Sequence, residues 1–100
     1  MAQKVCQINL QSPQPFVPDP VPVSKGNNDE VRWQCRDPFS VTSITPLNPF
    51  LRALPFNSVP LGGINIADSG PLVEKAAEQE YKCKFTIGGL PVDPHIDVGP

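Results

Sequence analysis

The chain has 100 residues, of which 39% are hydrophobic and 18% charged, and its formal net charge at pH 7 is −2. This length suits one domain with a single core, and the composition is neither that of a disordered chain nor that of a membrane protein. The charge gives no general attraction to nucleic acid or anionic lipid, and no apolar run is long enough for a transmembrane helix. We therefore predict no nucleic-acid partner and no membrane span.

Proline is the most unusual part of the composition, with 14 residues in 100. The prolines are spread along the chain, which argues against a polyproline ligand or a collagen repeat. Because proline breaks helix interiors and central strands, this number favours short strands joined by stiff turns. The composition thus predicts an all-β protein with long proline-rich loops and at most one short helical turn.

The amino-terminal part of the chain alternates apolar and polar residues in short stretches. Residues 5–11 predict a first strand that has Leu10 on its apolar face. Residues 12–20 contain four prolines and predict an extended, edge-like stretch. Residues 21–24 predict a short strand, and residues 25–29 predict the turn that follows it.

Two segments, residues 30–36 and 80–87, show the cleanest alternation in the chain. Successive side chains of a strand point to opposite faces, so each segment predicts a half-buried strand of an antiparallel sandwich. The inward side chains of the first segment are Val31, Trp33 and Cys35. Those of the second are Tyr81, Cys83, Phe85 and Ile87.

The middle of the chain is less regular. A turn at Asp37-Pro38 leads into a predicted strand over residues 39–44. Residues 45–68 hold apolar anchors without a sustained period and predict long loops with short strands. Residues 71–79 fit one helical turn and an irregular strand equally well.

The carboxyl-terminal part ends in a short predicted strand over residues 95–98, which a turn at Asp93-Pro94 precedes. Gly88-Gly89 is predicted to end the strand before that turn. The sequence contains no internal repeat and no linker, so we predict a single domain over residues 1–100.

Three cysteines, Cys6, Cys35 and Cys83, lie at apolar positions of predicted strands and have no metal-binding spacing. A free cysteine in such a place behaves as a small buried hydrophobic residue. Cys35 and Cys83 are at the centres of the two best strands, so a disulfide between them stays open. Two sheets pack about 10 Å apart, whereas a disulfide needs Cα atoms within about 7 Å, which favours free thiols.

Three stretches together suggest a family. A short strand, a glycine turn and a Val-x-Trp strand occupy residues 21–33, a Tyr-x-Cys-x-Phe strand occupies residues 81–85, and a terminal strand follows Asp93-Pro94. Their order resembles the cupredoxin-like fold, the small sandwich of plastocyanin and its relatives. The resemblance spans nearly the whole chain and implies a Greek-key β-sandwich.

The copper ligands of that family do not carry over to this chain. The resemblance puts Phe39 where copper-binding members have a histidine and Phe85 where they have the ligand cysteine. A blue-copper site needs two imidazoles and a thiolate, usually with an axial methionine. The one histidine here is His95 and the one methionine is Met1. The resemblance therefore implies a copper-free member with aromatic rings at the metal end, and we predict no cofactor.

His95 is also the sole imidazole available for acid–base or nucleophilic catalysis. A solvated side chain beside a turn is the simpler interpretation, so we predict no catalytic residue and no enzyme. Asp93, His95 and Asp97 form the one weak set of candidate metal ligands. Three such groups within one extended segment fit ordinary surface polarity as well.

Two further groups of side chains allow a structural and a functional interpretation. Aromatic rings in proline-bearing loops either plug the sandwich ends or form a partner patch, and plugging is favoured because a long loop must bury something to be ordered. They are Phe16, Phe50 and Phe56. Basic residues near the two best strands either form one basic face or are separately solvated. They are Lys25, Arg32, Arg36, Lys82 and Lys84.

We therefore expect a non-catalytic, copper-free binding or structural module with an unspecified protein partner. Relatives of this fold usually work outside the cytoplasm, so the resemblance implies a periplasmic or extracellular protein if a leader has been removed; no leader is visible here. Two alternatives remain open. One is an immunoglobulin-like adhesion or assembly domain, which a Cys35–Cys83 disulfide would favour. The other is a cysteine-based metal-handling or redox protein. The sequence leaves the oligomeric state open.

Overall fold

A computed structural model describes residues 3–87 and 90–100, and within these ranges all regular structure is β-strand. No helix of the described chain is long and apolar enough to cross a membrane. The strands, in chain order, are β1 (Gln3–Ile8), β2 (Phe16–Val17), β3 (Val21–Ser24), β4 (Glu30–Cys35), β5 (Phe39–Thr45), β6 (Phe56–Asn57), β7 (Val59–Leu61), β8 (Ile64–Asp68), β9 (Glu80–Ile87), β10 (Leu90–Val92) and β11 (His95–Gly99).

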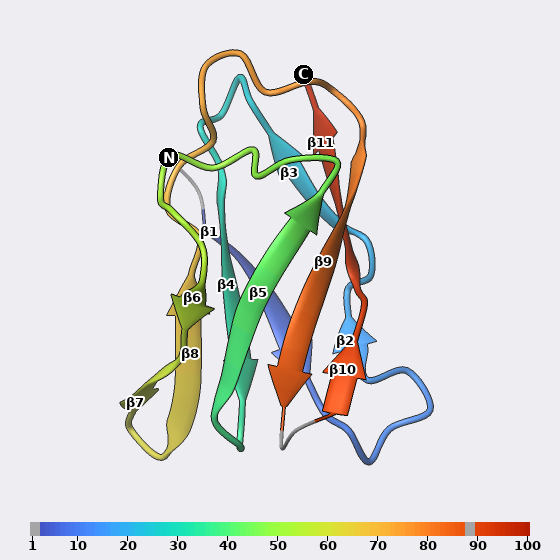
Figure 1. Cartoon of the computed structure of the whole chain (residues 1–100), viewed down its shortest axis with the longest axis vertical. Helices are drawn as coiled ribbons and strands as arrows, with labels where there is room; N and C mark the ends of the chain where they lie inside the picture. Colours follow the sequence, from blue (N-terminus) through green and yellow to red (C-terminus); the bar gives the residue numbers. More distant parts are fainter. Residues whose placement is uncertain (1–2, 88–89) are drawn as a thin grey trace.

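The strands form two mixed sheets that pack face to face as a sandwich (Figure 1). The first sheet has the order β2-β1-β4-β8-β7, and the second has the order β3-β11-β9-β5-β6, with β10 also paired to β9. Strands β1 and β4 run parallel, as do β3 and β11, and the remaining pairs are antiparallel. The all-β prediction is confirmed at this level.

The two strands that the sequence defined best are central in their sheets. β4 lies between β1 and β8, and β9 lies between β5 and β11. Every second residue of each strand is buried, and these are the residues that the alternation placed inward. The assignment of faces is therefore confirmed for both strands.

The first strand differs from its prediction. β1 begins two residues earlier than predicted and ends at Ile8, because a tight turn follows it. In that turn Ser12 N donates to Asn9 O at 3.0 Å, and Gln11 N donates to the side-chain oxygen of Asn9 at 3.0 Å. Leu10 is consequently 39% exposed instead of lying on the apolar face of the strand.

The middle of the chain, predicted over residues 45–68 as long loops with short strands, holds β6, β7 and β8. The sequence did not locate these strands individually, and β8 lies next to the central strand β4. Residues 71–79 form neither the helical turn nor the strand. Their strand-like pairing is limited to an isolated bridge between Leu72 and Phe50. The predicted break at Gly88-Gly89 lies outside the described residues.

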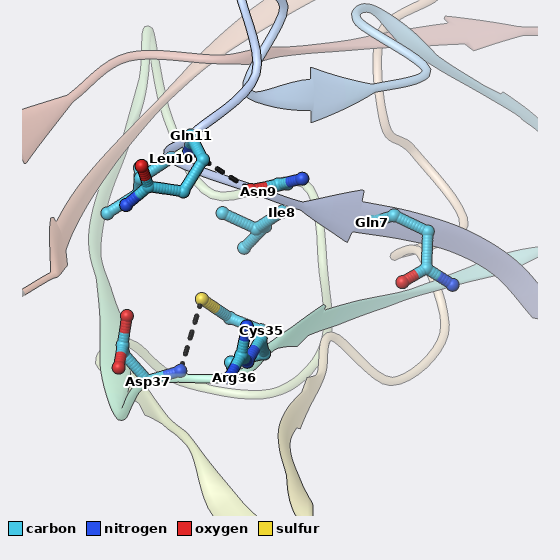
Figure 2. Close-up of a pocket in the computed structure, with 8 residues that line it drawn as sticks. All are labelled: Gln7, Ile8, Asn9, Leu10, Gln11, Cys35, Arg36 and Asp37. Carbon is cyan, nitrogen blue, oxygen red and sulfur yellow. Dashed lines mark hydrogen bonds between the residues drawn. The ribbon is translucent and has the colours of Figure 1, made fainter.

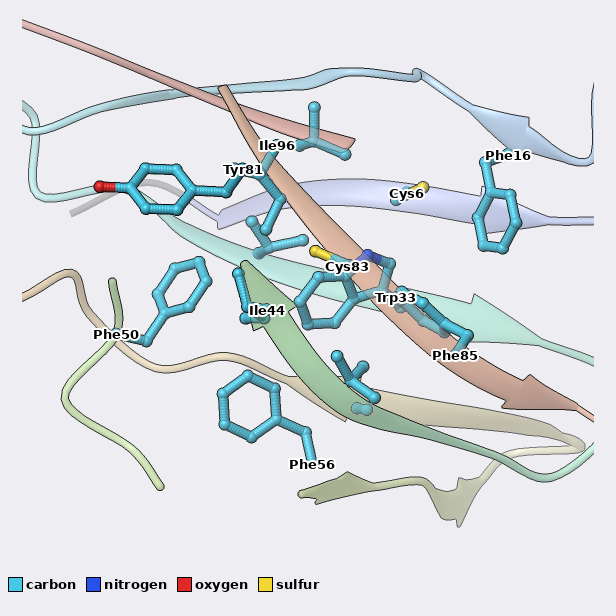
Figure 3. Close-up of a cluster of buried hydrophobic side chains, with 14 of the residues drawn as sticks. Cys6, Phe16, Trp33, Ile44, Phe50, Phe56, Tyr81, Cys83, Phe85 and Ile96 are labelled. Carbon is cyan, nitrogen blue, oxygen red and sulfur yellow. The ribbon is translucent and has the colours of Figure 1, made fainter. Parts of the chain in front are cut away.

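Aromatic rings from both sheets and from the loops meet in the core (Figure 3). The Phe85 ring is the centre of this cluster: its centroid lies 5.3 Å from that of Phe16 and 5.4 Å from that of Trp33. Phe50 and Phe56 are buried as well, with centroids 6.2 Å apart. The loop aromatics therefore plug the sandwich, as the sequence favoured, and do not form a surface patch.

Prolines accompany all four strands at the sheet edges. Pro22 lies within β3 and Pro60 within β7, Pro55 directly precedes β6, and Pro15 and Pro18 flank β2. Proline has no N–H to donate, so it weakens an exposed edge as a template for another strand. This placement gives five of the 14 prolines a physical role, and it leaves the ends and faces of the sandwich as candidate binding surfaces.

Candidate functional site

A hollow opens where the parallel strands β1 and β4 end and their chains diverge (Figure 2). It has a volume of about 650 Å³, within the range of small-molecule sites. One wall is the end of β1 and the turn after it, residues 7–11, and the other is residues 35–37. We call it the β1–β4 hollow.

The walls of the β1–β4 hollow combine an apolar surface with hydrogen-bonding groups. Ile8 and Cys35 are register partners whose side chains point toward one another in Figure 2, and Leu10 adds a half-exposed apolar side chain. The polar groups are two carboxamides, one guanidinium and one carboxylate, which belong to Asn9, Gln11, Arg36 and Asp37. Gln7 also lines the hollow, but its carboxamide donates to Gln34 on the outer face of the sheet. Such walls suit a ligand with one apolar part and one part that donates and accepts hydrogen bonds.

Local hydrogen bonds hold both walls in place. Asn9 N donates to Pro15 O at 2.7 Å, which anchors the turn to the start of β2. On the other side Asn65 Nδ2 donates to Arg36 O at 3.0 Å, and Asp37 N approaches Cys35 Sγ at 3.4 Å. The hollow is thus built on two turns that are fixed to the sheet, which favours a preformed site.

The three cysteines are all free thiols and all buried. Burial raises the pKa of the Cys6 thiol to about 12, with a smaller contribution from Asp19. Burial also raises the pKa of Cys83, and the next contribution comes from Cys6. Cys35 differs in position, because it ends β4 and lines the β1–β4 hollow.

The disulfide that the sequence left open between Cys35 and Cys83 is not formed in the structure. Cys83 lies in the middle of β9 opposite Ile44, whereas Cys35 is at the end of its strand beside Ile8. The cysteine that acts on the ionisation of Cys83 is Cys6. Cys35 therefore lies at the end of its strand and not at the centre, where the sequence had placed it.

The weak metal candidates Asp93, His95 and Asp97 have separate surroundings. Asp93 forms an ion pair with Lys82 at 3.4 Å. The His95 ring lies between two other carboxylates, with Nδ1 3.5 Å from Asp19 Oδ1 and Nε2 3.9 Å from Glu80 Oε1. No group of three or more histidine, cysteine or acidic side chains in the described chain has the geometry of a metal site.

The basic residues near the two best strands do not share one face. Arg32 lies on the outer side of the first sheet, where its guanidinium binds Asp68 at 2.7 and 3.0 Å. This hydrogen bond raises the pKa of Arg32. Lys82 and Lys84 are on the outer side of the second sheet, where they line a small hollow with Asp93. Arg32 and the two lysines therefore lie on opposite outer faces of the sandwich and do not form one basic face.

Phe39 and Phe85, which the family resemblance puts at ligand positions, are packed against each other in the core. Their ring centroids are 5.9 Å apart at an interplanar angle of 26°, and both side chains are buried. Phenylalanine rings contain only carbon and hydrogen, so these two side chains offer no lone pair to a metal.

Sequence reasoning did not find the β1–β4 hollow, because its residues come from two turns that are distant along the chain. The alternation of residues 5–11 assigned Leu10 to the core and so hid the turn. A scan against models of protein families found no match, and searches of curated proteins and of solved structures found none either.

Proposed function

We propose that this chain is a non-catalytic, copper-free binding module of the cupredoxin-like kind, and that the β1–β4 hollow is its binding site. The observation that carries the proposal is the hollow itself, a preformed concavity of about 650 Å³ with apolar and hydrogen-bonding walls. The edge prolines support it, because they disfavour binding by strand addition.

The assignment to the cupredoxin-like fold, including its Greek-key connections, rests on the sequence resemblance. The stretches that carry the resemblance form β3, β4, β9 and β11. The stacked Phe39 and Phe85 rings support a copper-free member, since apolar rings stand at both ligand positions.

The rival functions receive less support. An immunoglobulin-like domain would have gained from a disulfide between Cys35 and Cys83, and both are free thiols. A redox or metal-handling role needs thiolates, whereas burial raises the pKa of Cys6 and Cys83 and keeps both protonated near neutral pH. Catalysis by His95 gains no support, because the ion-pair partners of its ring in the described chain are the carboxylates of Asp19 and Glu80, and a hydroxyl or thiol nucleophile is not among them.

We expect titration with Cu(II) to give no blue-copper spectrum. Phe39 and Phe85 cannot bind the metal, and the sequence supplies only one imidazole. The measurement is the visible absorption of the purified protein during the titration, with nickel as a control for general metal binding. An intense thiolate charge-transfer band at about 600 nm would contradict the copper-free assignment.

The binding site is tested by nuclear magnetic resonance with a library of fragment-sized compounds that each carry an apolar group and an amide or carboxylate. We expect the largest amide shift changes at residues 7–11 and 35–37. Leu10→Asp should remove them, because it puts a charge on the apolar wall. Leu61→Asp is the matched control, since Leu61 is exposed on β7 and does not line the hollow. Shift changes centred elsewhere, or an unaffected Leu10→Asp variant, would rule out this hollow as the site.

A further inference from the structure

A second hollow lies beside the ends of β3 and β11, near the carboxyl end of the chain in Figure 1. It has a volume of about 290 Å³ and shares no lining residue with the β1–β4 hollow. Its charged groups are Lys4, Asp29 and Asp97. We call it the β3–β11 hollow.

Asp29 is the unusual residue in this hollow, because it has an ionisable carboxyl side chain and yet is only 1% exposed. Its Oδ2 accepts a hydrogen bond from Ser24 N at 2.8 Å, and its backbone N donates to Ser24 O at 3.1 Å. Its Oδ1 is buried and has no hydrogen-bond partner. Within the part of the chain that the structure describes, Asp29 also forms no ion pair.

A buried carboxylate oxygen without a partner is costly, so a native structure normally supplies it with a donor, a water or an ion. Asp97 brings a second carboxylate to the same hollow, and Asn27 brings an amide. Carboxylate, amide and main-chain oxygens are hard ligands, the type that Ca²⁺ prefers and that thiol- or imidazole-seeking metals do not.

We propose that the β3–β11 hollow binds a hard divalent cation of the Ca²⁺ class, with Asp29 as the buried ligand and Asp97 as the second carboxylate. Such an ion would tie the turn after β3 to the end of β11, the strand that pairs with β3. This site goes beyond the proposed binding function, because the two hollows are separate.

Lys4 limits the affinity of this site. Lys4 is one of the residues that line the same hollow, and the positive charge of its side chain repels a cation. With two carboxylates and one opposing charge, we expect a Kd of about 10⁻⁴–10⁻³ M, the range of weak extracellular calcium modules. The same charge gives a signature: Lys4→Met should tighten Ca²⁺ binding about threefold or more.

The test is calorimetric and thermal titration of the whole chain with CaCl₂, against NaCl at equal ionic strength. We expect saturable heat, and a rise in Tm of about 6–20 °C at roughly 10 mM Ca²⁺. Asp97→Asn should weaken binding about tenfold. Asp29→Asn should abolish it while keeping an acceptor for Ser24 N. Asp37→Asn, in the other hollow, is the matched control and should bind normally.

Three outcomes would overturn the proposal. One is the absence of heat and of a Tm shift in both the native chain and Lys4→Met. Another is a response that survives Asp29→Asn and Asp97→Asn, because the ion would then bind elsewhere. The last is loss of stability in Lys4→Met without any gain in Ca²⁺ affinity, which would make Lys4 itself the counter-ion of Asp29. If Asp29→Asn fails to fold, Asp97→Asn and Lys4→Met still decide the question.

Discussion

Replacing Trp33 by alanine is expected to lower the free energy of unfolding by about 3–5 kcal/mol. The indole is 1% exposed and contacts rings from the rest of the core, with centroids 5.4 Å from Phe85 and 6.2 Å from Phe56. A domain of this size has about 5–15 kcal/mol of stability, so this variant should be barely folded. The measurement is the denaturant midpoint followed by far-ultraviolet circular dichroism, a backbone signal that does not require the tryptophan.

The control for this prediction lies on the same strand. Gln34 is the next residue along β4 and points to the outer face, where it accepts an exposed hydrogen bond from Gln7 at 3.0 Å. Gln34→Ala should cost less than about 1 kcal/mol. Arg32 is a poorer control because it pairs with Asp68. Trp33→Phe should fold with an intermediate midpoint. Equal midpoints for Trp33→Ala and Gln34→Ala would mean that the inward and outward faces of β4 are misassigned.

The sequence predicted the fold well where a strand has one buried and one solvated face. β4 and β9 alternate over their whole lengths, and this signal predicted their faces and placed the limits of β9 at residues 80–87 and the end of β4 one residue too late. It did not locate β8 within the stretch predicted as long loops with short strands, because Ile64 and Ile66 are on the outer side and Ala67 faces the core. A small inward residue and two large outward ones reverse the usual pattern, so local periodicity could not reveal this strand. Only its pairing with β4 and β7 defines it.

The candidate sites were less predictable than the fold, because both hollows depend on contacts between distant segments. Leu10 belongs to the wall of the β1–β4 hollow only because the chain turns after Ile8. Asp29 looked like an ordinary turn residue in the sequence, yet the end of β3 and the end of β11 enclose it. The set Asp93, His95 and Asp97 shows the opposite error, since residues close in sequence have separate partners in the structure.

The three thiols are expected to react with a thiol reagent in a definite order, with Cys35 first. Cys35 is 5% exposed and lines the β1–β4 hollow, whereas Cys6 and Cys83 are fully buried. The thiolate is the reactive form. Raising the pKa of Cys6 from 9.0 to about 12 leaves it a thiolate fraction roughly 1000-fold lower than that of an exposed cysteine at pH 8. Cys83 is shifted in the same direction. We expect one labelled site per native chain, and three in denaturant without reductant.

The matched variant for this order is Cys35→Ser, which should remove the native labelling phase and leave the two slow sites unchanged. Cys6 and Cys83 should then react only as fast as the chain unfolds, so Trp33→Ala should accelerate both. The raised pKa values also set a pH dependence. The folded state keeps these thiols protonated, so their contribution to stability is complete below about pH 9 and is lost as the pH rises toward 12. Rapid native labelling of Cys6 or Cys83 would contradict their burial and would restore the redox alternative, and fewer than three labelled sites in denaturant would restore the disulfide.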